Sequence, residues 1–179
     1  MNKQRPPGLT PFLVTKEYRR FAEFCDACRR HRYMGLCYGV PGVGKTLSAH
    51  YYAQWDVVLA ERRRIFDDPP APEPFERRTV VYTAPVVGTP QAIARELLEL
   101  CGLIDTLVRW GMAFRQGTDD LLYSSRGGPY TELVIVDEAD RLKTAGLEQV
   151  RDLYDRGRFG LVLLGMPGLE KRLARYPQL

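Results

Sequence analysis

Short apolar runs alternate with longer stretches of helical spacing along this chain of 179 residues. The apolar runs, rich in β-branched and aromatic residues, predict strands at residues 33–38, 79–83, 133–137 and 161–164. Apolar positions three or four residues apart predict helices at residues 16–32, 45–64, 89–101, 103–114 and 144–156. Thr118 is a candidate cap for a further short helix that ends before Gly127. Strands that are apolar on both faces and alternate with helices indicate an α/β fold, with a mostly parallel central sheet flanked by helices.

Length and proline content suggest how the chain is organised. A chain of 179 residues supports one globular domain, which we place at residues 16–179 after an N-terminal extended segment at residues 1–15. Residues 67–74 include four prolines, which exclude a helix or a central strand and predict an exposed connector. No apolar stretch approaches the roughly 20 residues of a membrane span, and no apolar signal segment follows the N-terminus. We therefore expect a cytoplasmic protein without a membrane partner.

Composition, charge and cysteine content narrow the class of protein and its possible partners only a little. With 45% hydrophobic and 27% charged residues, the composition argues against a disordered or fibrous protein. The net charge of +4 permits a polyanionic partner without requiring one. Four cysteines in a cytoplasmic chain are expected to be reduced thiols. Cys25 and Cys28 share a helix face with Phe21 and Phe24, a pattern that favours core packing over a zinc site.

The strongest chemical signal is a glycine-rich segment between the first predicted strand and the helix that follows it. Its sequence, Gly39-Val40-Pro41-Gly42-Val43-Gly44-Lys45-Thr46, has the spacing of a phosphate-binding loop. Glycines let main-chain amides approach phosphate oxygens, and the N-terminus of the next helix attracts the same anion. Lys45 is expected to reach the β and γ phosphates of a bound nucleotide, and the Thr46 hydroxyl to bind Mg²⁺. The predicted nucleotide-binding segment extends through Leu47.

Two carboxylates follow a buried strand. Asp137 and Glu138 come directly after the apolar residues 133–136, and α/β sheets bind their ligands at the carboxyl ends of strands. Asp137 is therefore expected to hold the Mg²⁺ shell, and Glu138 to orient and deprotonate an attacking water. A carboxylate next to the metal ligand favours hydrolysis of ATP over phosphate transfer to a small molecule. Both motifs together predict a P-loop NTPase that uses Mg²⁺, and the resemblance described below implies that its nucleotide is ATP.

Two other enzyme classes are disfavoured by the sequence. The run Asp137-Glu138-Ala139-Asp140 spells the signature of the DEAD-box helicases, but the second ATPase lobe and the Ser-Ala-Thr motif of those enzymes are missing from the sequence. His50 is not accompanied by a serine or cysteine nucleophile motif, so a hydrolytic triad has no support.

The two motifs and the segments around them resemble a known family of ATPases. Together with residues 9–15, 79–90 and 160–179, they resemble the AAA ATPases of DNA transposition, meaning the TniB, TnsC and Mu B type of target-selection regulator. The resemblance covers most of the chain and implies an AAA+ fold of the ASCE type. It implies an ATPase that assembles on duplex DNA, as a ring or filament, and directs a transposase to target sites. DNA and oligomerisation are then expected to stimulate hydrolysis.

The resemblance also assigns roles outside the two motifs. In such proteins an arginine from the neighbouring subunit completes the nucleotide site, and Arg172 and Arg175 are the nearest candidates, with a solvated helix face as the alternative. Adenine recognition maps onto residues 12–15, with Phe12 and Val14 as the candidate contacts and a strand that packs on the core as the alternative. The candidate DNA phosphate contacts, for which solvated surface is the alternative, are Arg95, Arg109, Arg115 and Arg126.

Two departures from the family pattern bear on activity. Family members commonly carry a polar residue at the end of the fourth strand to hold the attacking water, whereas this chain has Met166 after Gly165. A thioether is only a weak acceptor, so we expect slow turnover or a polar group supplied from elsewhere. The sequence also predicts four strands where the family has five, and no C-terminal helical lid. It is therefore expected to be an incomplete ATPase or a naturally short one.

Two further functions stay open at this point. A helicase loader or replication initiator shares the fold and the DNA contact but acts on a helicase instead of a transposase. A nucleotide-gated interaction switch binds ATP and hydrolyses little of it. Met166 and the missing lid favour the switch.

Overall fold

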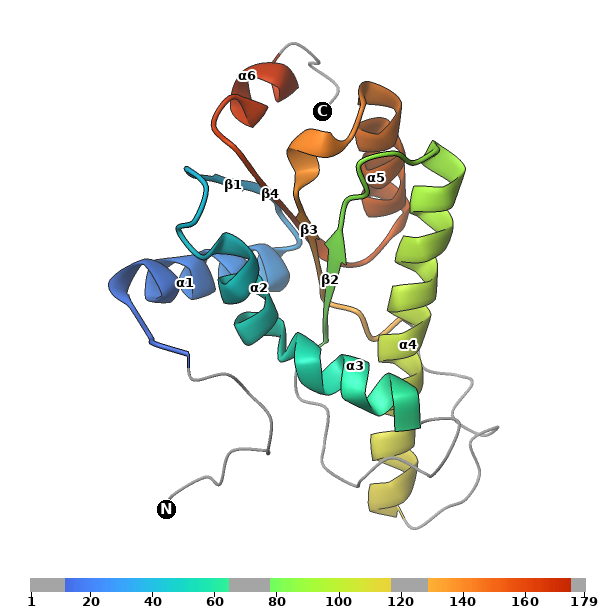
Figure 1. Ribbon diagram of the computed structural model, residues 1–179. Coiled ribbons are helices and arrows are strands. Elements are labelled where there is room, and N and C mark those ends of the chain that lie inside the picture. The colour runs from blue at the N-terminus through green and yellow to red at the C-terminus, as the bar shows by residue number, and fades with distance from the viewer. Residues whose placement is uncertain (1–11, 65–77, 117–128, 175–179) are drawn as a thin grey trace.

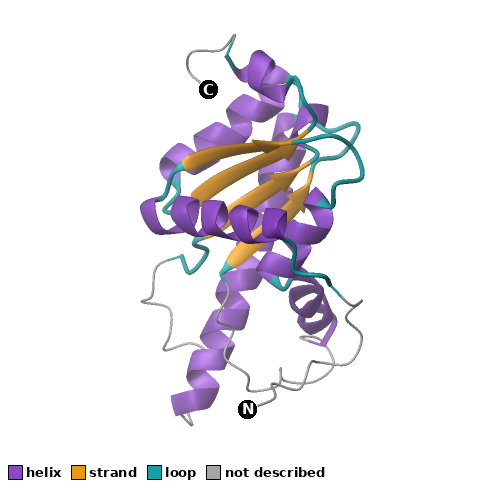
Figure 2. Cartoon of the chain, turned by 90° about the vertical axis from the view of Figure 1, so that its left-hand side faces the viewer, coloured by secondary structure: helices purple, strands orange, loops and turns teal. Residues whose placement is uncertain are grey.

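A four-stranded parallel sheet forms the centre of the molecule (Figures 1 and 2). The computed structural model describes residues 12–64, 78–116 and 129–174. Within them the strand order is β1-β4-β3-β2, and every neighbouring pair is parallel. The strands are β1 (Met34–Tyr38), β2 (Thr79–Thr83), β3 (Leu133–Asp137) and β4 (Gly160–Gly165). The predicted α/β fold of a P-loop NTPase, with a mostly parallel sheet flanked by helices, is confirmed.

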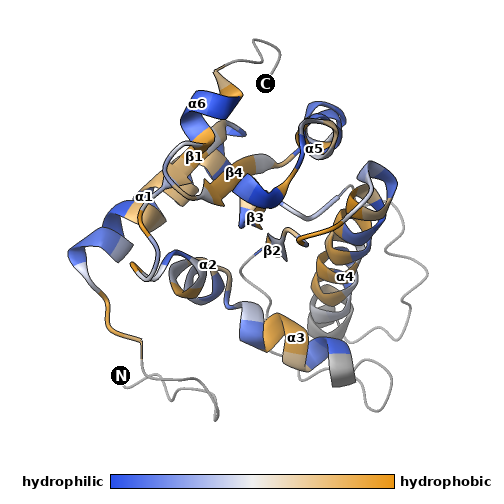
Figure 3. Cartoon of the chain, turned by 45° about the horizontal axis from the view of Figure 1, so that its top comes forward, coloured by the Kyte–Doolittle hydropathy of each residue, from blue (hydrophilic) through white to orange (hydrophobic). Residues whose placement is uncertain are grey.

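Helices cover both faces of this sheet (Figure 3). On one face lie α1 and α2, and on the other lie α4 and α5 (Figure 3). The helices are α1 (Lys16–His31), α2 (Lys45–Ala53), α3 (Trp55–Arg64), α4 (Pro90–Gln116), α5 (Thr144–Arg156) and α6 (Leu169–Leu173), with a 3₁₀ turn η2 (Ala139–Arg141). Because the sheet is buried on both sides, β3 and β4 contain only residues that are almost fully shielded from solvent.

The single helix predicted for residues 45–64 is wrong, because the chain breaks at Gln54. This residue adopts a left-handed conformation with φ of 51°, and its N–H caps α2 by donating to the carbonyls of His50 and Tyr51. The break reorients α3 so that Trp55 and Val58 are buried in the core. No glycine or proline marks this position, so the sequence pattern alone gives little sign of it.

The two helices predicted for residues 89–101 and 103–114 form one continuous helix, α4. Gly102 lies in its interior, where glycine costs about 1 kcal/mol relative to alanine. Burial outweighs this cost, because Ile93 and Leu97 before the glycine, and Ile104 and Val108 after it, are all buried along one side of the helix.

The cysteines of α1 belong to the core, as the sequence predicts. Cys25 and Cys28 are 0% and 3% exposed, and burial raises the pKa of both thiols. The helix approaches the sheet so closely that a Cβ on Gly160 would overlap the main-chain carbonyl of Cys28. Gly160 is therefore required where β4 begins.

Some predicted features lie outside the described residues. These are the connector at residues 67–74, the short helix after Thr118, and residues 1–11 of the extended segment. Residues 12–15 are in neither a helix nor a strand, and Thr15 caps α1 by accepting a hydrogen bond of 3.1 Å from the Tyr18 amide. Of the helices that the structure describes, none is both long enough and apolar enough to cross a membrane.

Candidate nucleotide-binding site

The glycine-rich loop joins the carboxyl end of β1 to the N-terminus of α2 (Figure 1). Gly42 and Gly44 have φ values of 79° and 82°, a left-handed conformation that side chains other than glycine adopt at a cost. A Cβ at either position would meet no neighbour within 4 Å, so the backbone conformation, not crowding, requires glycine there. These two glycines therefore set the main-chain path of the loop.

The side chain of Lys45 folds back over this loop. Its Nζ donates hydrogen bonds of 2.6 Å to the carbonyl of Gly39 and 3.0 Å to the carbonyl of Val40. Among the described residues that line the cavity here, Lys45 is the only cation. An anion entering the cavity thus meets one positive charge and the positive end of the α2 dipole.

Thr46 and Asp137 form a direct hydrogen bond. Oγ1 of Thr46 donates to Oδ2 of Asp137 at 2.6 Å, and the Glu138 amide donates to Oδ1 of Asp137 at 2.9 Å. Asp137 is only 2% exposed, and it makes no ion pair within the described part of the chain. A buried carboxylate without a cationic partner is costly, which makes this pair a suitable place for a bound cation.

The donor set fits Mg²⁺. This ion prefers oxygen ligands and is usually held by one or two side chains together with substrate phosphates and water. The hydroxyl of Thr46 and the carboxylate of Asp137 supply such ligands. In residues 12–64, 78–116 and 129–174 there is no group of three or more His, Cys, Asp or Glu side chains that could hold a metal ion by itself.

Glu138 turns sharply out of the strand that ends at Asp137. Its φ of 56° and ψ of 34° place it in the left-handed region, at the N-cap of η2. A residue other than glycine in this conformation is strained, and such strain gathers at functional sites. Its carboxylate pairs with Arg141 at 3.2 Å, and Arg141 also donates to the carbonyl of Ala84 at 3.4 Å. The acid is thereby held at the rim of the site.

These elements enclose one cavity of about 350 Å³ at the carboxyl ends of the strands. Its lining comes from the loop, the start of α2, the end of β3, η2 and the end of β4. The lining residues are Pro41, Gly42, Gly44, Lys45, Thr46, Leu47, Asp137, Glu138, Asp140, Gly165 and Met166. The structure thus brings the two predicted motifs into one cavity.

Comparison with known proteins agrees with this geometry. The pattern of a family described as "AAA domain" matches residues 28–173. The chain belongs to the AAA domain family. It is also 40% identical over 172 residues to a protein of Staphylococcus aureus named "Potential ATP-binding protein". The match covers 94% of this chain and 63% of that protein, so the chain spans less than two thirds of the length of its relative. ATP binding by an AAA-type ATPase domain is thus supported by the fold, the site and the family.

Asp140 is a residue of this AAA domain that sequence reasoning missed. Its Oδ1 accepts a hydrogen bond of 3.0 Å from the main-chain amide of Met166, and its side chain lines the cavity. A Cβ on Gly165 would lie 2.9 Å from the same oxygen and 2.7 Å from Cδ2 of Leu169. The available signal was the spacing, since Asp140 follows Asp137 by only three residues and so lies close to the same end of β3.

Of the two candidate trans arginines, Arg172 is bound within its own subunit. It donates a hydrogen bond of 2.6 Å to the carbonyl of Asp140 and a second one to the carbonyl of Leu142. These contacts tie α6 of the AAA domain to the turn that carries Glu138. Arg175 lies outside the described residues. A role for either arginine in a neighbouring subunit stays a prediction.

The predicted adenine contacts lie apart from the residues that line the cavity. The Phe12 ring stacks on the Tyr51 ring, with centroids 4.0 Å apart and an angle of 14°, and meets Tyr18 edge-on at 4.8 Å. Val14 is 43% exposed. Tyr51 is on α2, one turn after Leu47, so this aromatic cluster borders the helix that begins at the AAA domain's phosphate-binding loop. Adenine recognition there remains a prediction.

The structure describes the side chains of two predicted DNA contacts, Arg95 and Arg109, and these two lie far apart. Arg95 is exposed and lies 3.9 Å from Glu99, and Arg109, about 21 Å further along α4, has a buried Nε without a hydrogen-bond partner. Arg115 lies on the last turn of α4, and Arg126 lies outside the described residues. Arg95 and Arg109 therefore do not share one site, and DNA binding by the four arginines stays a prediction.

Proposed function

We propose that this AAA domain hydrolyses ATP and regulates DNA transposition, by assembling on duplex DNA and directing or activating a transposase at target sites. Two separate lines of support carry the two halves of the proposal. The contact of Thr46 with Asp137, with Glu138 beside it, supports hydrolysis. The resemblance of residues 9–15, 79–90 and 160–179 to transposition ATPases supports the DNA-directed role.

Each residue of the site has a separate task in the proposed reaction. Main-chain amides of Gly42, Val43 and Gly44 and the ammonium of Lys45 bind the phosphates and offset their charge. Thr46 and Asp137 would hold Mg²⁺, and the bound ion would supply positive charge that offsets the charge of the phosphates. Glu138 orients a water and accepts its proton as the oxygen attacks the γ-phosphorus. The bond from that phosphorus to the β-phosphate oxygen breaks, and ADP and inorganic phosphate leave.

Assembly follows from the same proposal. The ATP site would lie between neighbouring copies of the chain, with an arginine such as Arg172 or Arg175 supplied in trans. For Arg172 this requires release of the carbonyls of Asp140 and Leu142. Hydrolysis would then depend on protein concentration and on DNA that gathers the subunits.

The deciding experiment measures ATP turnover and DNA binding on the same samples. We expect duplex DNA to raise turnover, and ATP to raise the affinity for DNA. Glu138→Gln should stop turnover and trap an assembly on DNA, and Lys45→Ala should weaken both ATP binding and assembly. Turnover without any ATP-dependent DNA binding would refute the transposition half and leave the hydrolytic half standing.

One observation favours a second candidate function. Met166 lines the cavity at the end of β4, where a polar side chain would help to hold the attacking water. A nucleotide-gated interaction switch, which binds ATP and barely hydrolyses it, needs no such group. Negligible turnover in the presence of DNA, together with tight ATP binding, would select the switch over the ATPase.

A further inference from the structure

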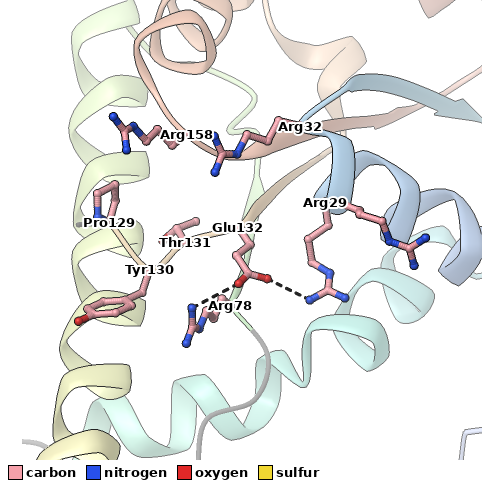
Figure 4. A pocket seen from close by; sticks show the side chains of 9 residues that line it. Arg29, Arg32, Arg78, Pro129, Tyr130, Thr131, Glu132 and Arg158 are labelled. Carbon is pink, nitrogen blue, oxygen red and sulfur yellow. Dashed lines mark hydrogen bonds and ion pairs between the residues drawn. The ribbon is translucent and has the colours of Figure 1, made fainter. Parts of the chain in front are cut away.

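A second cavity, of about 460 Å³, opens at the opposite end of the sheet, where strands begin (Figure 4). Arg78 directly precedes β2, Glu132 directly precedes β3, and Arg158 lies shortly before β4. Strands of this length rise about 17 Å. The two cavities are therefore separated by the length of the sheet, and a ligand in one leaves the other open.

Arginines dominate this second cavity. Five of them line it, with Glu132 as the only acid among its described lining residues. Figure 4 shows the Glu132 carboxylate between two of these arginines. Arg29 binds one of its oxygens at 3.0 Å and Arg78 binds the other at 3.3 Å. Arg29 also lies 3.4 Å from Asp26. These two guanidinium groups thus have structural partners.

The other three arginines have no such partner among the described residues. Arg30, Arg32 and Arg158 are exposed, and no hydrogen bond or ion pair of their side chains occurs within the described part of the chain. Arg30 belongs to the last turn of α1, where a positive charge complements the helix dipole. Arg32 and Arg158 lie outside any helix, and Figure 4 places both on one side of the cavity. Unpaired like charges held in one cavity favour an anionic ligand.

The backbone conformation of Arg32 gives an independent indication that this side chain has a function. It caps α1 in a left-handed conformation, with φ of 54° and ψ of 42°, at a position where helices usually have glycine. The hydroxyl of Tyr154 donates a hydrogen bond of 2.7 Å to the Arg32 carbonyl and helps to hold this conformation. An arginine kept where glycine would fit with less strain points to a use for its side chain.

We propose that Arg30, Arg32 and Arg158 bind phosphate groups of a duplex DNA backbone. The inference rests on the proposed function and adds to it a DNA-binding surface distinct from Arg95, Arg109, Arg115 and Arg126. Guanidinium groups bind phosphate through paired N–H donors and remain charged at all relevant pH values. Phosphate contacts carry no sequence information, so the proposed contact is independent of base sequence.

The test compares two triple variants of the full chain that remove the same positive charge. One is Arg30→Ala, Arg32→Ala and Arg158→Ala. The control is Lys16→Ala, Arg19→Ala and Arg20→Ala, which removes exposed charges at the other end of α1, about 15 to 21 Å away from Arg30. Fluorescence anisotropy with a labelled duplex, in the presence of ATP and across a salt series, gives the affinity and its salt dependence.

We expect the cavity variant to lose at least about tenfold in DNA affinity, and the slope of log Kd against log salt to fall by about 3. The control should change the slope by less than about 1. Equal losses in the two variants, or no loss in the cavity variant, would overturn the proposed site while the DNA-directed function stands. If the wild-type chain binds no DNA, both the proposed site and the DNA-directed function are overturned.

Two further measurements keep the outcome interpretable. Arg32→Gly removes one of the three charges and relieves the left-handed strain, so it should weaken DNA binding in a protein that is at least as stable as the wild type. A polyglutamate peptide tests the rival ligand. If it binds and requires the three arginines while their removal leaves DNA affinity unchanged, the cavity serves an acidic protein segment and the DNA proposal is overturned.

Discussion

The hydroxyl of Thr46 donates a hydrogen bond of 2.6 Å to the carboxylate of Asp137 and so joins the start of α2 to the end of β3. The two residues are 91 positions apart in the sequence. Parallel strands bring them together, because β1 and β3 both point their carboxyl ends at the same edge of the sheet. The pair supplies a hydroxyl and a carboxylate from two different elements, the usual protein contribution to a nucleotide-bound Mg²⁺.

Removal of either member of this pair should abolish the metal-dependent part of ATP affinity. We expect Thr46→Ala and Asp137→Asn to weaken ATP binding at least about tenfold in Mg²⁺, since changes near a metal commonly cost 10- to 100-fold. Calorimetry with Mg²⁺ and with EDTA separates the metal-dependent part. Thr46→Ser keeps the hydroxyl and serves as the control. Equal affinities for all three variants in Mg²⁺ would exclude the pair as the metal site.

Glu138 should affect catalysis without affecting binding. Glu138→Gln keeps the size of the side chain but removes the base, so we expect kcat to fall by about 10²- to 10⁴-fold with little change in ATP affinity. Single-turnover assays measure the chemical step, and equilibrium titration with ATP measures binding. A variant that hydrolyses ATP at the wild-type rate would remove Glu138 from the mechanism and point to another base.

The contact of Asp140 with Met166 should contribute to stability. In Asp140→Ala the half-buried amide of Met166 loses its acceptor, at a cost of about 1 to 3 kcal/mol in the free energy of unfolding. Gly165→Ala should cost a similar amount, about 1 to 3 kcal/mol, because its Cβ would crowd Asp140 and Leu169. Urea unfolding measures both. If neither change lowers the midpoint, Asp140 does not hold the end of β4 in place.

The strands and the nucleotide motifs could be predicted from the sequence for a physical reason. A strand buried on both faces, such as Leu133–Asp137, reads as a continuous apolar run, and the loop from Gly39 to Thr46 follows a local spacing imposed by phosphate. Neither feature depends on distant parts of the chain. The acidic residues at the strand end could be placed beside the loop because parallel topology fixes that edge.

Features that depend on tertiary packing could not be predicted in this way. The break at Gln54 serves the burial of Trp55, and the continuity of α4 through Gly102 depends on what that helix packs against. The arginine cavity joins Arg30 with Arg158, residues that lie far apart in the sequence. Each arginine taken alone resembles a solvated surface residue, and only the fold shows that three of them share a cavity in which none pairs with an acid of the described residues.

Met166 provides a test of whether this site is built for rapid hydrolysis. Replacing it with asparagine puts an amide at the end of β4, beside the cavity that contains Glu138. One polar group oriented toward the transition state commonly raises the rate more than tenfold. We therefore expect Met166→Asn to raise kcat roughly tenfold. Met166→Leu is the matched control and should leave kcat unchanged. An unchanged kcat in both variants would mean that another group, such as Asp140, already holds the water.

Arg32 should prove suboptimal for stability. Arg32→Gly relieves the strain of the left-handed conformation, which should raise the free energy of unfolding by about 1 to 2 kcal/mol. The added freedom of glycine in the unfolded chain offsets about 0.4 to 1 kcal/mol of this gain. We therefore expect a net gain of roughly 0.5 kcal/mol, seen as a higher Tm, whereas Arg30→Gly within α1 should lose about 1 kcal/mol. If Arg32→Gly lowers Tm as much as Arg30→Gly does, the arginine stabilises the fold at this position, and its conformation is no argument for a ligand.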